Sequence, residues 1–441
     1  MRRTPGWILV LAAIGALTVV VTVAVGVFAI ISGRGSYVTG AVMGLAGEYD
    51  DAAPTSTPSP AAGSPQAKSS SPDFYSQPAE VPAQPGTIIR SEPLEYAVVG
   101  GQGYRIAYTS LDAAGTPIAV SGMVFLPTTP APAEGRRILA WAHGTVGLAA
   151  RCAPSAATAY SSTGWLERAL AEGWVVTASD YAGLGMPGAP TYLVGQQEAR
   201  DVVNSVRAAR LFPDSSTGTD WLVYGASQGG HAALWTADQA AALAPELTLR
   251  GVAAAVPAAE LPTIMAAQWN NAMGWLIGSY AIVSWQPAYP SRDFQSALSR
   301  SGRNQFTSLS SQCIAAGAAS AIVLNRINGP FFTASPLSNP DWSATVTEQM
   351  PQQPPAGMPM YLAQGMDDTV VLASSNIKLN ADWCAAGVTI DSLWLPGVNH
   401  QDTSVVAGPA VMEWAAARFA GEAPPNTCGT PPPTPTSTPA S

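Results

Sequence analysis

Apolar runs alternate with stretches of helical spacing along most of the chain. The apolar runs predict strands over residues 104–108, 118–125, 137–142, 174–178, 221–224, 251–256, 359–363 and 389–395. Apolar positions at helical spacing predict helices over residues 165–172, 194–211, 229–242, 373–384 and 405–419. Because most strands alternate with helices, we expect an α/β fold with a mainly parallel central sheet flanked by helices on both faces.

The alternation breaks between residues 261 and 356, which are aromatic and irregular, and residues 261–291 carry no charged side chain. We interpret residues 261–356 as a helical cap or lid inserted into an α/β core formed by residues 87–260 and 357–428. A second membrane span and an ordinary packed insertion are the alternatives. Pro262, Gln268 and Asn270 interrupt the apolar run that a span would need.

Both ends of the chain differ in composition from the predicted core. Residues 7–32 contain no charged side chain and follow residues 1–6, which carry Arg2 and Arg3. A helix of that length exceeds the ~30 Å hydrocarbon core, so we expect a membrane anchor with residues 1–6 in the cytoplasm. A signal segment cleaved near residues 41–47 is the alternative. The Pro- and Ser-rich residues 33–86 and the Pro- and Thr-rich residues 429–441 predict a disordered linker and a disordered tail.

Composition narrows the range of partners. Only 11% of the 441 residues are charged, the net charge is −9 and no basic patch is present, which argues against a nucleic-acid partner. So little charge suits an extracytoplasmic protein with an apolar substrate, and we assign no oligomeric state. An even number of cysteines in an exported chain predicts disulfides, with three possible pairings. The cysteines are Cys152, Cys313, Cys384 and Cys428, spaced too widely for a zinc site.

The motif Gly225-Ala226-Ser227-Gln228-Gly229 lies between a predicted strand and a predicted helix. In that context G-x-S-x-G is typical of a nucleophile elbow, a sharp turn that exposes the serine at its apex. A Cβ atom at either glycine would crowd the turn. We therefore predict that Ser227 is a catalytic nucleophile.

A serine hydroxyl needs a base within hydrogen-bond reach and a third group that orients the base. After a nucleophile elbow these partners follow in the order acid, then histidine. Of the three histidines, only His400 lies far downstream, in a polar loop after the last predicted strand, and we predict that it is the base. The G-x-x-D-x-V-V pattern selects Asp368 as the acid, and the adjacent Asp367 is the alternative.

The remaining chemistry is assigned from the same loops. Two backbone N–H groups should stabilise an oxyanion: that of Gln228, directly after the nucleophile, and that of Thr145 in the glycine-containing loop 143–147. His231 is expected to pack beneath the elbow, and His143 to order its loop. No dinucleotide or P-loop motif is present, so we expect no metal and no organic cofactor.

These segments together resemble the secretory lipase family of the α/β-hydrolase superfamily. The matching segments are residues 141–145, 152–155, 179–185 and 225–231, with the loops around Asp368 and His400. The resemblance implies an α/β-hydrolase fold with a helical cap inserted before the acid strand. It also implies the disulfides Cys152–Cys313 and Cys384–Cys428.

The function expected from the site and the resemblance is hydrolysis of carboxylic esters, acting on a lipid or small-molecule ester through an acyl-enzyme. The enzyme would be exported, either tethered to its own membrane by residues 7–32 or secreted after cleavage. An acyltransferase or peptidase with the same three residues is one alternative. A catalytically silent cell-surface binding domain is another, and the presence of all three residues argues against it.

Overall fold

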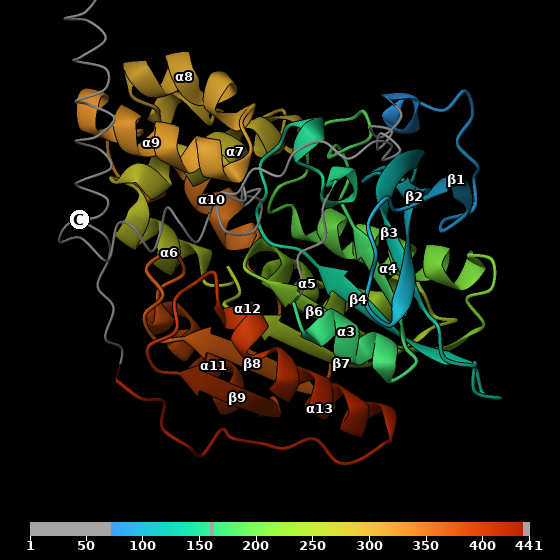
Figure 1. The fold of residues 1–441 in the computed structure, drawn as a ribbon. Helices are drawn as coiled ribbons and strands as arrows, with labels where there is room; N and C mark the ends of the chain where they lie inside the picture. The colour runs from blue at the N-terminus through green and yellow to red at the C-terminus, as the bar shows by residue number, and fades with distance from the viewer. Residues whose placement is uncertain (1–71, 159–162, 435–441) are drawn as a thin grey trace, which may run out of the picture.

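A computed structural model describes residues 72–158 and 163–434. The described residues form one sheet in the order β1-β2-β3-β5-β4-β6-β7-β8-β9 (Figure 1). Its strands are β1 (Ile88–Pro93), β2 (Gly101–Leu111), β3 (Pro117–Pro127), β4 (Arg136–Ala142), β5 (Val175–Ser179), β6 (Thr217–Ala226), β7 (Thr248–Ala255), β8 (Met360–Gly365) and β9 (Ile390–Leu395). In this sheet order, every pairing from β5-β4 to β8-β9 is parallel. The pairings β1-β2, β2-β3 and β3-β5 are antiparallel. The predicted mainly parallel sheet is confirmed.

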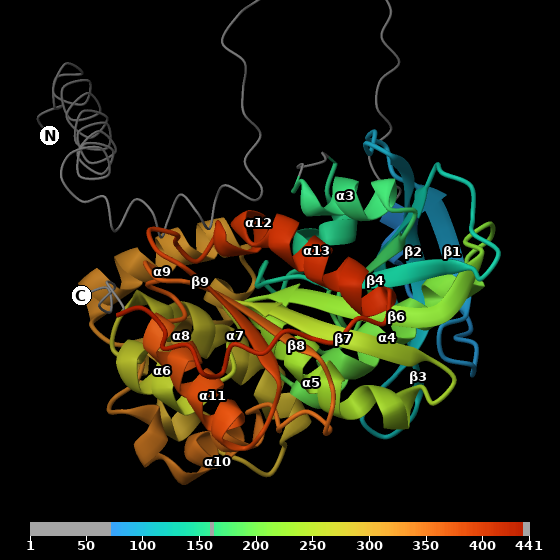
Figure 2. The same cartoon turned by 90° about the horizontal axis from the view of Figure 1, so that it is seen from below.

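Helices cover both faces of the sheet (Figure 2). On one face, α4 (Gly195–Leu211), α5 (Gln228–Leu243) and α11 (Ala373–Ala385) bury their apolar sides against the strands. On the other face, α3 (Trp165–Ala171) and α13 (Gly408–Phe419) do the same, with Trp165 and Trp414 among the buried side chains. Strands buried on both faces need the continuous apolar runs that the sequence provides.

The segment between β7 and β8 is helical. It contains α6 (Leu261–Gln268), α7 (Ala272–Ala288), α8 (Arg300–Ser310), α9 (Ile314–Asn328) and α10 (Pro340–Glu348). These helices share a core of their own that includes Trp275, Trp285 and Trp342. In the described part of the chain, no helix combines the length and the hydropathy that a bilayer crossing requires. We refer to residues 256–359 as the insert.

Two disulfides join parts of the chain that lie far apart in sequence. Cys152 pairs with Cys313, at the start of α9, and Cys384 in α11 pairs with Cys428. These are the pairings that the resemblance implies. The first tethers the segment after β4 to the insert, and the second tethers α11 to the C-terminal residues.

Three details differ from the predictions. The edge strand β1 is absent from the predicted elements, because its residues are only partly buried and lack a clear apolar pattern. The last predicted helix is two helices, α12 (Thr403–Val406) and α13, and Pro409 at the start of α13 marks the break. The predicted linker is wrong beyond residue 72, because Phe74 is buried and its carbonyl accepts a hydrogen bond from Arg90. The predicted anchor, the rest of the linker and residues 435–441 of the tail lie outside the described residues.

Candidate active site

Ser227 lies at the sharp bend between β6 and α5. Its φ of 56° falls in the left-handed region, which is strained for a residue with a side chain. The Ser227 N–H donates to the Ala255 carbonyl at 3.0 Å, and the Ser227 carbonyl accepts from His231 N at 3.0 Å. A Cβ on Gly229 would lie 1.8 Å from the Ala142 carbonyl oxygen, so only glycine lets α5 approach β4 this closely.

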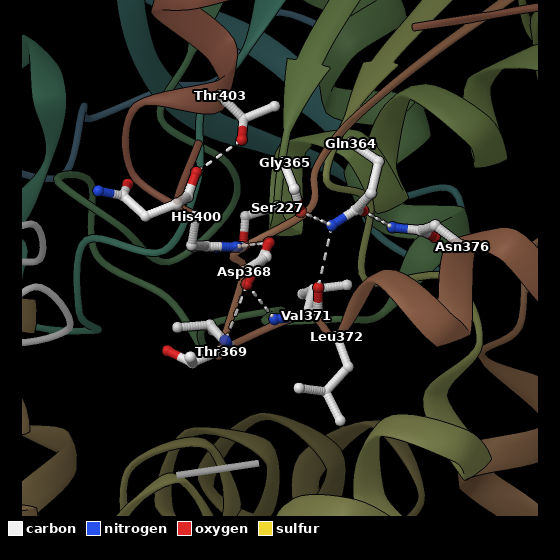
Figure 3. A network of polar contacts seen from close by, with 12 residues as sticks. Ser227, Gln364, Gly365, Asp368, Thr369, Val371, Leu372, Asn376, His400 and Thr403 are labelled. Carbon is white, nitrogen blue, oxygen red and sulfur yellow. Dashed lines mark hydrogen bonds and ion pairs between the residues drawn. The ribbon is translucent and has the colours of Figure 1, made fainter. Parts of the chain in front are cut away.

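The structure brings Ser227, His400 and Asp368 together (Figure 3). His400 Nε2 lies 2.9 Å from Ser227 Oγ, and His400 Nδ1 lies 2.7 Å from Asp368 Oδ2. Because Nδ1 faces a carboxylate, it carries the ring proton and leaves Nε2 to accept from the serine. The arrangement is a hydroxyl, an imidazole and a carboxylate joined in series by two hydrogen bonds.

The loop after β8 holds the Asp368 carboxylate in place. Asp368 is fully buried, and its Oδ1 accepts from Val370 N and Val371 N at 2.8 Å each. The adjacent Asp367 side chain is exposed, and it is Asp368 that faces His400. Gln364 was missed by the sequence analysis: its Nε2 donates to the Val371 carbonyl at 3.3 Å and so fixes the far side of this loop. The signal was a glutamine within an otherwise apolar buried strand.

The two predicted oxyanion donors flank Ser227. Gln228 is the first residue of α5. At the N-terminus of a helix, the backbone N–H groups have no partner within the helix, and the helix dipole has its positive end there. On the other side, a Cβ on Gly144 would lie 3.6 Å from Ser227 Cβ, which places loop 143–147 beside Ser227. Thr145 Oγ1 lies 3.1 Å from the hydroxyl of Tyr192. Burial raises the pKa of Tyr192 well above its usual range, so that hydroxyl stays protonated.

The other two histidines do not contact Ser227 Oγ. His231 is fully buried and bonds Glu198 and the Gln349 carbonyl through its two ring nitrogens. His143 packs against Tyr181 with the ring centroids 4.6 Å apart and bonds the Gly144 carbonyl through Nδ1 at 2.7 Å. Among the described residues, no three His, Cys, Asp or Glu side chains are grouped as metal ligands.

A cavity of about 140 Å³ opens onto Ser227 and His400. Most of its wall is apolar and comes from the insert, including Met265, Trp269, Ile277 and Phe332. A buried polar group in this wall, Gln268, also escaped the sequence analysis. Its Nε2 donates to the carbonyls of Thr369 and Val370 at 2.7 and 3.1 Å, and so ties α6 to the loop that carries Asp368.

The sheet order, the helices on both faces and the elbow at the end of β6 define an α/β-hydrolase fold. Comparison with protein families agrees and goes further, since the model described as "Secretory lipase" matches residues 153–427. The chain belongs to the secretory lipase family, and it is a carboxylic ester hydrolase of the lipase type.

Curated relatives cover most of the chain at low identity. Lipase 5 of Candida albicans is 25% identical over 401 residues, covering 80% of this chain and 82% of the relative. A Mycobacterium tuberculosis protein named "Probable inactive lipase MT1628" is 25% identical over 374 residues, covering 79% of this chain and 82% of the relative.

Solved structures show the same fold. Candida antarctica lipase A in its closed state aligns with a TM-score of 0.65 and 19% identity, covering 84% of this chain and 91% of that structure. The rice cell wall degrading esterase LipA from Xanthomonas oryzae aligns with a TM-score of 0.59 and 21% identity, covering 76% of this chain and 98% of that structure.

Proposed function

We propose that this protein is a serine hydrolase that cleaves lipid-like carboxylic esters through an acyl-enzyme intermediate. The single observation that carries the proposal is the run of two hydrogen bonds from Ser227 Oγ through His400 to the buried Asp368. Each side chain comes from a different sheet-end loop, which a purely structural role would not require.

The reaction proceeds in two halves. Ser227 Oγ attacks the ester carbonyl carbon while His400 Nε2 takes the hydroxyl proton, and Asp368 stabilises the imidazolium. The Gln228 and Thr145 N–H groups stabilise the carbonyl oxygen as it becomes an oxyanion. The intermediate then expels the alcohol, which leaves with the proton from His400. A water molecule repeats the sequence on the acyl-enzyme and releases the carboxylic acid.

The size of the cavity favours a substrate whose acyl group is larger than acetyl. An apolar cavity of roughly 150 Å³ holds a benzene-sized group, so the cavity of about 140 Å³ accepts an apolar chain of similar bulk. The residues that would contact this chain come from the insert, which we propose acts as a cap. We further propose that the enzyme is exported, supported by the charge-free residues 7–32, the two disulfides and the secretory family.

The test is the substitution S227A, measured with p-nitrophenyl esters of increasing chain length. Loss of the nucleophile should lower kcat by roughly 10⁶-fold. A fluorophosphonate probe should label Ser227 in the wild type and leave the variant unlabelled. The matched control is S284A, which removes a buried hydroxyl in α7 that has no hydrogen-bond partner among the described residues.

Undiminished ester hydrolysis by S227A would refute the assignment of Ser227 as the nucleophile. If the wild-type protein hydrolyses no ester and the probe does not label it, the chain would instead be a catalytically silent member of its family. Adding an alcohol acceptor and analysing the products separates hydrolysis from acyl transfer.

A further inference from the structure

A buried carboxylate lies behind the elbow and is not part of the Ser227–His400–Asp368 arrangement. Glu198 is in the first turn of α4 and is fully buried. Its Oε1 accepts from Gln228 Nε2 and from Leu193 N, at 2.9 Å each. Its Oε2 accepts from His231 Nδ1 at 2.8 Å. A buried charge is costly unless it is fully bonded, so these bonds define where the surrounding groups must lie.

The two bonds to Oε1 reach both sides of the oxyanion site. One holds the side chain of Gln228, whose backbone N–H is the first proposed donor. The other holds Leu193, which follows Tyr192, and Tyr192 in turn contacts the Thr145 hydroxyl at 3.1 Å. Leu193 has a φ of 51°, a left-handed conformation that a leucine keeps only when its surroundings impose it.

His231 extends the network behind Glu198. Its Nδ1 lies 2.8 Å from Glu198 Oε2, and its Nε2 lies 2.7 Å from the Gln349 carbonyl oxygen. The Trp235 indole N–H lies 3.1 Å from His231 Nε2 and 3.2 Å from the same carbonyl oxygen. The histidine that contacts Glu198 Oε2 is therefore itself held from its far side.

We propose that Glu198 is the positioning residue of the oxyanion site, because one of its oxygens fixes both sides that carry the proposed donors. The inference rests on the proposed function. Glu198 touches neither substrate nor the reacting atoms in this arrangement, so it acts through Gln228 and through the Tyr192–Thr145 contact. Its effect falls on the oxyanion, a charge that develops only as the transition state forms.

The substitution E198A removes both carboxylate oxygens, so Gln228 Nε2 and Leu193 N lose the acceptor that they share. Loss of one oxyanion donor typically costs ~10²–10³ in kcat, so displacing the donors should cost about 10- to 100-fold. KM should change little, because the ground-state ester carries no oxyanion.

The matched control is D201A, one turn further along α4. Asp201 is also fully buried and accepts bonds from Ser110 and Ala182 N, but it bonds neither Gln228 nor Leu193. A loss caused only by disturbing α4 would fall equally on both variants. We expect D201A to keep its kcat at temperatures well below its Tm, and E198A to lose its kcat with the acid limb of its pH–rate profile unchanged.

A second variant, Q228A, removes the contact from the other end while keeping the backbone N–H. It should also lower kcat by about 10-fold or more, and the double variant E198A/Q228A should lose less than the product of the two single losses. If E198A does not fold, Q228A alone decides, and an unchanged kcat overturns the inference. A folded E198A with wild-type kcat, or equal losses in E198A and D201A, also overturns it. Absence of Ser227-dependent activity in the wild type would overturn the proposed function, and this inference with it.

Discussion

The disulfide Cys152–Cys313 offers a direct test of how the insert supports the active site. Beside it, Ile314 N donates to the Val146 carbonyl at 2.9 Å, and Gly147 pairs with Cys313 as an isolated bridge. The tether therefore joins the start of α9 to the loop that carries Thr145. We expect the double variant C152A/C313A to lose activity because this loop is released from the insert.

The other disulfide provides the scale for stability. In the chain-entropy relation, closing a loop of 161 residues stabilises the fold by up to ~5 kcal/mol and closing one of 44 residues by up to ~4 kcal/mol. The two contributions to the free energy of unfolding should therefore differ by only about 1 kcal/mol. The positions of the two bonds differ more, because Cys313 is next to Ile314 in the cavity lining, whereas Cys384 and Cys428 have no sequence neighbour in it. Similar destabilisation with unequal loss of activity is the expected signature.

The assay is kcat/KM for a p-nitrophenyl ester at a temperature well below the Tm of both variants, with Tm measured by circular dichroism. C152A/C313A should lose about 10-fold or more in kcat/KM, because a shift of about 1 Å in a positioning group costs up to ~10²-fold. C384A/C428A should stay near the wild type. Wild-type kcat/KM in C152A/C313A, or equal losses in both variants, would refute the reasoning.

Three further outcomes are expected. G229A sets a Cβ 1.8 Å from a backbone oxygen of β4, so it should cost at least ~10²-fold in kcat/KM or prevent folding; a folded, fully active variant would contradict this. Burial raises the pKa of Asp201 from 3.8 to about 6, so the folded state binds its proton more tightly and this contribution to stability is lost as pH rises through about 6. The free energy of unfolding of the wild type minus that of D201N should therefore fall by about 2 kcal/mol between about pH 4 and about pH 7 in urea titrations, and a flat difference would refute the shift. Q268L removes both hydrogen bonds from α6 to the loop that carries Asp368, so it should speed hydrogen exchange at the backbone amides of residues 369–371. Unchanged exchange would show that the contact does not restrain the loop.

Local patterns were sufficient to predict most of the architecture. The alternation of apolar runs and helical spacing depends on neighbours in sequence, and it predicted every strand of the parallel part of the sheet. The missed strand β1 contains Arg90, Ser91 and Glu92, which is a composition that an edge strand tolerates and that periodicity does not reveal. The packed start of the domain was missed for a different reason, because Phe74 and Tyr75 are two aromatic residues within a Pro- and Ser-rich segment.

The candidate active site also contains residues that local patterns predict and residues that only tertiary packing reveals. Ser227, Asp368 and His400 were predicted because each lies in a loop at a recognisable place relative to the strands. Glu198 and Gln268 could not be, because no motif marks either residue and their bonds to Gln228 and Thr369 form only when separate elements pack together. A glutamate or glutamine in a helix is most often a solvated residue, and only the packing of one element on another gives these two their partners.

The insert leaves the sheet at the end of β7 and returns at the start of β8, and these two strands are parallel neighbours, with Val252 opposite Met360 and Ala255 opposite Ala363. Its two ends therefore lie at opposite edges of the sheet, and the insert is the crossover that parallel neighbours require. Its helices can be lengthened, shortened or exchanged during evolution without rethreading the sheet, provided that the chain still returns to the other edge. An ancestor could acquire a new substrate range in this way while keeping its hydrolytic machinery. A new insert would have to keep only two contacts with the core. These are a side-chain donor to the loop that carries Asp368, as Gln268 provides, and a backbone carbonyl beside His231, as Gln349 provides.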